Sequence, residues 1–142
     1  MPSPFTQSQA LGILTHAPAS EVKNFADELL PLLEAGLTVA QNRTGLVMLP
    51  CRDTVHGTLF HLGEVLIAEA EVRREGLTGY GAVLGRDLEQ ALAVALIDLA
   101  WQGAIASERV AAFLEAAHSD QHDAHEQLFQ QVEATRVQME TF

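Results

Sequence analysis

The stretch GYGAVLGRDLEQALAVALID, Gly79 to Asp98, places three glycines and an Arg-Asp pair ahead of a strongly apolar run. Asp87 is a favourable N-cap residue, because its carboxylate can accept hydrogen bonds from the unpaired N–H groups at the start of a helix. Gly103 stands where that helix would end. The predicted helix is apolar around almost its whole circumference, which indicates burial on more than one side. So small a chain has little material to cover it, and we expect another subunit to cover part of it.

The sequence before this helix is typical of short β-strands. TGLVMLPCR, Thr44 to Arg52, is a brief apolar run, and apolar and polar residues alternate from Glu64 to Arg73. Glu75-Gly76 is a turn signal, and a further strand is expected over Tyr80 to Leu84. A short strand near Thr58 to Phe60 is only weakly indicated. Together these segments predict a small antiparallel sheet.

Helical spacing marks both ends of the chain. Thr6 and Gln9 have the spacing of a capping box, and a second helix follows. Pro31 interrupts its pattern, so we expect a kink or a restart there and an end near Gly36. Ser107 can cap a long final helix. The apolar stripe of that helix consists of Val110, Leu114, Ala117, Gln121, Ala124, Leu128, Val132, Thr135 and Met139.

The predicted fold class is therefore α+β: a small antiparallel sheet with two N-terminal helices, a central apolar helix and a long C-terminal helix. The 142 residues have the length of one ordinary domain, and we expect a single domain over residues 1–142.

Composition excludes several function classes. The chain has 19 acidic and 8 basic residues and a formal net charge of −11, so its field repels nucleic acids and anionic membranes. The single cysteine, Cys51, forms no internal disulfide, and the start of the chain lacks the pattern of a secretion signal, which indicates a cytoplasmic protein. The longest apolar run, Leu88 to Trp101, is too short to span a membrane and contains Asp98.

The glycines before the central helix resemble a phosphate-binding loop only in part. The G-x-x-x-x-G-K-[ST] pattern requires glycine at Tyr80, lysine at Arg86 and a hydroxyl residue at Asp87, and all three are absent. The ordinary interpretation is a strand-to-helix turn in which Asp87 caps the helix. A contact between Arg86 and an anionic ligand stays open.

Two other clusters of reactive side chains are candidates. His118, His122 and His125 lie on one face of the final helix and could ligate zinc, but the H-E-x-x-H pattern is missing and a solvated, pH-sensitive surface is the simpler interpretation. Cys51 could act as a nucleophile with His56 or His61 as base. Cys51 lies in an apolar strand, however, where a packed thiol is the ordinary case.

Several motifs in the middle of the chain occur in a distinctive order. They are TGLV at Thr44, an array formed by Gly57, Phe60, Gly63, Glu64, Leu66, Ala70 and Val72, GY at Gly79, GRD at Gly85 and ALID at Ala95, with weaker similarity at LTHA from Leu14 and at Arg136-Val137. In order and spacing these motifs, over roughly Arg43 to Gln102, resemble the PhnG family, the G subunit of the bacterial carbon-phosphorus lyase system.

The resemblance implies a role inside an assembly. In that system the G, H and I subunits, with an ATPase-like L subunit, replace the adenine of ATP by an alkylphosphonate and so form a ribose 1-phosphonate 5-triphosphate. The I subunit is the usual candidate for the nucleosidase chemistry, and the iron-sulfur subunit J later breaks the carbon-phosphorus bond. The G subunit is an accessory component of this transferase and lyase system.

We therefore expect a non-catalytic subunit of alpha-D-ribose 1-methylphosphonate 5-triphosphate synthase, with PhnI-, PhnH- and PhnJ-type partners. ATP would be a substrate of the complex, and no cofactor is expected on this chain. Tyr80, Arg86 and Asp87 belong to the motifs shared with the family and are candidates for substrate or subunit contact. The exposed apolar surface predicts self-association when the chain is alone. The alternative is a stand-alone metal-binding or small-ligand module that uses the histidine face.

Overall fold

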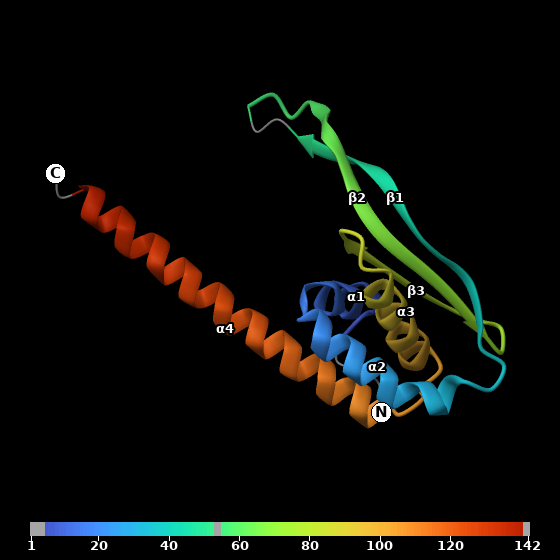
Figure 1. Ribbon diagram of the computed structural model, residues 1–142. Helices are drawn as coiled ribbons and strands as arrows, with labels where there is room; N and C mark the ends of the chain where they lie inside the picture. Colours follow the sequence, from blue (N-terminus) through green and yellow to red (C-terminus); the bar gives the residue numbers. More distant parts are fainter. Residues whose placement is uncertain (1–4, 53–54, 141–142) are drawn as a thin grey trace.

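The computed structural model describes residues 5–52 and 55–140, with side chains described there except at 49–52, 60–62 and 132–140. Helices and strands follow one another in the order that the sequence predicts, and the fold is α+β (Figure 1). The elements are α1 (Gln7–His16), α2 (Ala19–Leu33), β1 (Thr38–Arg52), β2 (Leu59–Arg74), β3 (Leu77–Leu84), α3 (Leu88–Gln102) and α4 (Ser107–Glu140).

The two N-terminal helices confirm the sequence signals except at Pro31. Thr6 Oγ1 accepts a hydrogen bond from the Gln9 N–H at 3.2 Å, and the Thr6 N–H donates to Gln9 Oε1 at 3.0 Å, which completes the capping box. The predicted restart at Pro31 is wrong, because α2 continues to Leu33. Pro31 lies in the last turn, so the ring removes one N–H close to the end of the helix rather than in its interior. Gly36 follows with φ of 76°, as a chain leaving a helix requires.

The sheet is antiparallel, with the strand order β1-β2-β3. Glu75 and Gly76 form the turn between β2 and β3 and both have positive φ, 49° and 81°, which confirms the predicted turn. β1 and β2 are longer than the sequence predicts, and the weakly indicated strand near residue 59 is the beginning of β2. β1 already starts at Thr38, where polar and exposed residues give no apolar alternation to recognise.

Helix α3 lies at the centre of the core. Its residues 91 and 93–100 are buried, and it contacts β2 and β3 of the sheet as well as α1, α2 and α4 (Figure 1). Ala68, Ala70 and Val72 of β2 share the sheet face that packs on it. The predicted burial on more than one side is confirmed. The sheet and the other three helices of the chain cover most of this helix, so cover by another subunit stays a prediction for the part left exposed, such as Leu88 at 37%.

Helix α4 begins one residue earlier than its predicted cap implies. The Val110 N–H donates to the Ala106 carbonyl at 3.0 Å, so Ala106 holds the N-cap position and Ser107 is the first helical residue. The prediction that Ser107 caps the helix is therefore wrong. The first part of the apolar stripe, Val110, Leu114 and Ala117, is buried, whereas every side chain described after Gln121 is exposed.

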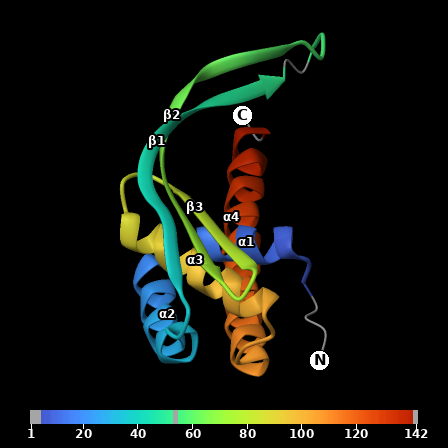
Figure 2. The same ribbon diagram turned by 90° about the vertical axis from the view of Figure 1, so that its right-hand side faces the viewer.

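Two segments extend from the body of the molecule. β3 pairs with β2 only as far as Ile67 opposite Leu84, so residues 46–52 of β1 and 59–66 of β2 continue as a two-stranded ribbon, here named the hairpin arm. Residues 122–140 of α4 are named the helix arm. Figure 2, which turns the view of Figure 1, shows that both arms leave the body on the same side.

Candidate functional site

The glycines that suggested a phosphate loop serve the packing of β3 on α3. A Cβ at Gly79 would lie 2.8 Å from Leu99 Cβ, and a Cβ at Gly81 would lie 2.8 Å from the Ala95 backbone N, closer than real Cβ atoms approach such atoms. Only glycine therefore allows the helix to lie directly on the strand. Gly85 has φ of 104°, which any other residue rarely adopts, and turns the chain from β3 toward α3.

The Asp87 carboxylate is occupied by protein groups. Its Oδ1 accepts a hydrogen bond from the Gln90 N–H at 3.0 Å, which confirms the predicted N-cap, and its Oδ2 lies 2.8 Å from Lys23 Nζ. The hydrogen bond from Lys23, and after it the one from the Gln90 N–H, lowers the pKa of Asp87, while the same bond to Asp87 raises the pKa of Lys23. The start of α3 thus already carries a carboxylate where a phosphate would sit. The Arg86 side chain is exposed and has no hydrogen bond or ion pair with the described residues.

Tyr80 lies on the face of the sheet that points away from α3. It stands at the end of a row of polar side chains that crosses all three strands. Its hydroxyl donates to Glu69 Oε2 at 3.0 Å, and Arg43 Nε donates to Glu69 Oε1 at 2.8 Å. The bonds from Arg43 and then from Tyr80 lower the pKa of Glu69. Burial and the bond to Glu69 raise the pKa of Tyr80, so the phenol stays protonated at neutral pH. This row links strands and offers no unpaired base for catalysis.

Asp98 is a buried carboxylate that none of the sequence motifs single out as a site. It is only 2% exposed, and its Oδ2 accepts hydrogen bonds from the Tyr80 N–H at 3.0 Å and from Gln102 Nε2 at 2.9 Å. Gln7 Nε2 of α1 approaches its Oδ1 at 3.3 Å. Burial is the main cause that raises the pKa of Asp98, against the opposing effect of these bonds. Asp98 thus joins α1, α3 and the edge of β3. Its signal in the sequence is an acid within an otherwise apolar run.

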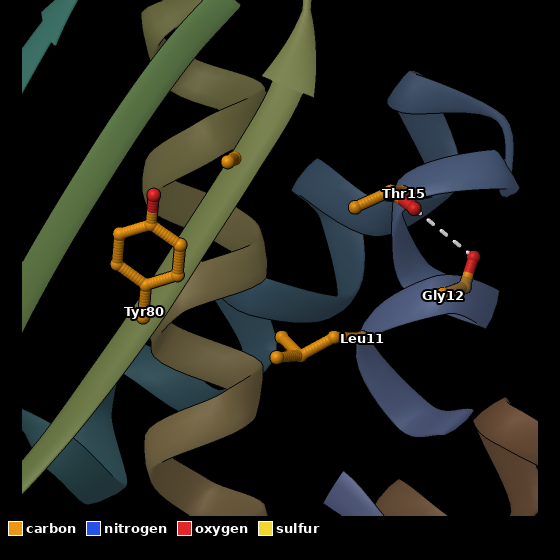
Figure 3. A pocket seen from close by; sticks show the side chains of 5 residues that line it. Leu11, Gly12, Thr15 and Tyr80 are labelled. Carbon is orange, nitrogen blue, oxygen red and sulfur yellow. Dashed lines mark hydrogen bonds between the residues drawn. The ribbon is translucent and has the colours of Figure 1, made fainter. Parts of the chain in front are cut away.

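A shallow groove runs between α1 and β3, beside Tyr80 (Figure 3). It encloses about 230 Å³ and is lined by Leu11, Gly12, Thr15, Tyr80 and Ala82. Figure 3 shows Leu11 directed from α1 toward the strand, and the Thr15 hydroxyl donates to the Gly12 carbonyl at 3.0 Å. The lining is mostly apolar and carries no cation, so the groove lacks the groups that bind a phosphate or phosphonate.

The three histidines do not converge. The His118 ring packs against the edge of Phe5 at a centroid distance of 5.4 Å, and His122 Nε2 lies 3.4 Å from Glu126 Oε1. All three imidazoles, including that of His125, are on exposed positions. Within the part of the chain that the structure describes, no group of three His, Cys, Asp or Glu residues is arranged to hold a metal ion.

The proposed pair of Cys51 with His56 or His61 stays a prediction. The side chains of Cys51 and His61 lie outside the described residues, and His56 is exposed in the loop between β1 and β2. Among the described residues no helix is both long and apolar enough to cross a membrane.

Exposed apolar side chains are the most distinctive chemical feature of the described surface, and many of them lie on the two arms. Leu46 is 63% exposed and Met48 53% exposed on the hairpin arm, and Leu128 and Phe129 are each 59% exposed on the helix arm. Sequence patterns did not locate this surface, because the same apolar residues would equally fit a strand or helix buried in a core. A surface of this kind is typical of a protein interface rather than of an active site.

Comparison with known proteins identifies the chain. The profile of the family described as phosphonate metabolism protein PhnG matches residues 6–142, which is nearly the whole chain. Curated proteins give no significant match. The match extends the similarity found at the central motifs to both terminal helices. The chain belongs to the PhnG family of phosphonate metabolism proteins.

Proposed function

We propose that this chain is a non-catalytic subunit of the carbon-phosphorus lyase core complex. In this role it supports the conversion of ATP and an alkylphosphonate to ribose 1-phosphonate 5-triphosphate, with release of adenine, and its partners are PhnI-, PhnH- and PhnJ-type subunits. The observation that carries the proposal is the family match over residues 6–142. The chain would act as one domain in the cytoplasm, without a cofactor of its own, while ATP is a substrate of the complex.

The chemistry of the described side chains supports an accessory role. Asp87 is engaged by Lys23 and the helix start, Asp98 is buried among amide donors, and Glu69 is paired with Arg43. Nucleophilic or acid-base catalysis needs a reactive group within reach of both a substrate and a second positioned group. No such arrangement lies in the α1–β3 groove, whose polar groups are two hydroxyls from Thr15 and Tyr80 and backbone atoms.

Arg86 remains the candidate for direct contact within the complex. It is the exposed cation at the start of α3, beside the capped Asp87, and its position suits a carboxylate of a partner subunit or a phosphate of the substrate. Arg86→Ala should leave the fold intact, because the side chain is exposed and forms no hydrogen bond or ion pair with the described residues. Weaker assembly would indicate the subunit contact, and intact assembly with weaker ATP binding would indicate the substrate contact.

The proposed function is tested by leaving this subunit out. The neighbouring PhnI-, PhnH-, PhnJ- and L-type subunits are produced with and without this chain, and adenine release from ATP and methylphosphonate is measured. We expect loss of assembly and activity without the chain and recovery when it is added back. The triple variant His118→Gln, His122→Gln and His125→Gln should recover full activity, since no metal is required. Full activity without the chain, or adenine release by the chain alone, would contradict the proposal.

A further inference from the structure

The hairpin arm lacks the cover that a two-stranded ribbon needs. Cross-strand pairs run from Leu46 opposite Leu66 to Arg52 opposite Leu59, and no third strand among the described residues accompanies them. Isolated two-stranded hairpins are marginally stable in water. Strand alternation places Leu46, Met48 and Leu66 on the same face as Ala68, which packs on α3. The apolar face of the core thus continues along the arm without a helix of this chain to cover it.

The helix arm is similarly exposed. The contacts of α4 with the body include the bond from Gln121 Nε2 to the Ile13 carbonyl, at 2.9 Å, and every described side chain from His122 to Gln131 is exposed. Such a projecting helix gains most of its stability in proteins by packing an apolar face against another element. Leu128 and Phe129 are the large apolar side chains available for that contact.

The charge beside these apolar residues selects the kind of partner. On the helix arm, the described side chains, residues 122–131, include the two carboxylates Asp123 and Glu126 and no lysine or arginine. A second copy would bring acidic edges together between chains that each carry a formal charge of −11. A partner surface with apolar side chains bordered by lysines or arginines is complementary to the arm in hydrophobicity and in charge.

We propose that the hairpin arm and the helix arm together bind a different protein chain through an apolar surface rimmed by basic residues. The inference rests on the proposed function, because it locates the contact with a neighbouring subunit and states its chemistry. The arms leave the body on the same side, so one partner can contact both (Figures 1 and 2). Burial of the arms by this partner supplies the cover that the body of the chain does not provide.

The apolar part of the inference is tested by single charges placed on each arm. The chain is produced with the PhnI-, PhnH- and PhnJ-type subunits, and the affinity of the purified variants for those subunits is measured. Leu46→Glu and Phe129→Glu should each weaken binding about tenfold or more, because a buried charge would be left unpaired at the centre of the contact. Leu32→Glu is the matched control, since Leu32 is 47% exposed on α2, away from the arms. Phe129→Ala, which preserves helix propensity, repeats the test if a charged variant loses its helical circular dichroism.

The charge part is tested by reversal on the helix arm. The double variant Asp123→Lys and Glu126→Lys should weaken binding at low salt, and the wild-type affinity should fall as salt rises, because screening reduces attraction between opposite charges. The double variant Asp27→Lys and Glu34→Lys, on exposed positions of α2 and its C-terminal end, changes the net charge by the same amount and is the control. If the wild type binds the subunits and the arm variants bind them equally well, the proposed surface is overturned while the proposed function stands. If the wild type binds none of these subunits, the proposed function is overturned as well. If the chain alone forms a discrete dimer that Phe129→Glu abolishes, the arms bind a second copy and the inference is overturned.

Discussion

Asp98 shows how one buried residue can join three elements. Its carboxylate accepts hydrogen bonds from the Tyr80 N–H on the open edge of β3 and from Gln102, which also donates to the Thr78 carbonyl at 2.7 Å. Side chains of α3 therefore form hydrogen bonds with the backbone of the β3 edge at Thr78 and Tyr80. A sequence pattern reveals the unusual acid but not its partners, because they come from elements distant in the chain.

The stability contribution of Asp98 should depend on pH. Burial raises its pKa above the ordinary value of 3.8, so its contribution is fully present below that value and is lost as pH rises through the folded-state pKa. Asp98→Asn cannot ionise and keeps an acceptor for the Tyr80 N–H. In urea unfolding from pH 4 to pH 8, we expect the stability of Asp98→Asn relative to wild type to increase with pH. A difference that does not vary with pH would contradict this assignment.

Asp98→Leu should lose about 2 kcal/mol of unfolding free energy, since the buried N–H groups lose their acceptor.

Asp87 should have the opposite pH dependence. Its pKa is lowered below 3.8, so its contribution is present above that value and is lost as pH falls through the lower folded-state pKa. Asp87→Asn keeps the cap oxygen and removes the charge pair with Lys23, whereas Asp87→Ala removes both. At pH 7 the melting temperature should therefore decrease from wild type to Asn to Ala. Equal melting temperatures for the two variants would show that the cap bond contributes nothing.

At the scale of elements, the contact between β3 and α3 decides the fold, and its glycines are the most sensitive positions. Gly81→Ala would place a Cβ against the backbone of α3, where neither element can move without the other, and should cost about 3 kcal/mol. Gly12→Ala is the matched control, because nothing lies within 4 Å of its added Cβ and α1 should gain about 1 kcal/mol from the higher helix propensity of alanine. Chemical denaturation of both variants checks the prediction. A similar small effect at both positions would contradict this account of the glycines.

Much of this architecture is predictable from the sequence, for stated physical reasons. The capping box at Thr6, the cap at Asp87 and the turn at Glu75 and Gly76 were recognisable because a few adjacent residues determine each of them. The full lengths of β1 and β2 could not be predicted, because exposed strand residues need no apolar alternation. The cover of α3 was missed because it depends on how distant helices pack. The projection of the arms likewise depends on where the third strand ends, which local patterns do not encode.

At the scale of the whole molecule, exposed apolar arms and a large negative charge have opposing effects on the isolated chain. Apolar contact favours association between copies, while the net charge of −11 opposes it. Sedimentation of the purified chain should therefore show weak, concentration-dependent association without a discrete dimer, and this association should increase from low to high salt because salt screens the repulsion. Binding of the physiological partner should have the opposite salt dependence. A monomer at every salt concentration, with no binding of a hydrophobic dye, would contradict the predicted self-association.

The central claim is that the arms are the surface through which this PhnG-family chain joins its complex. Hydrogen exchange measured on the isolated chain and on the complex purified with its PhnI-, PhnH- and PhnJ-type subunits tests it most directly. Exposed ribbons and unpacked helices exchange rapidly, and burial in an interface slows them. We predict strong additional protection of residues 46–52, 59–66 and 122–140 in the complex, with little change in α2. Protection confined to the α1–β3 groove or to the histidine face at His118, with arms that exchange as in the isolated chain, would contradict the claim.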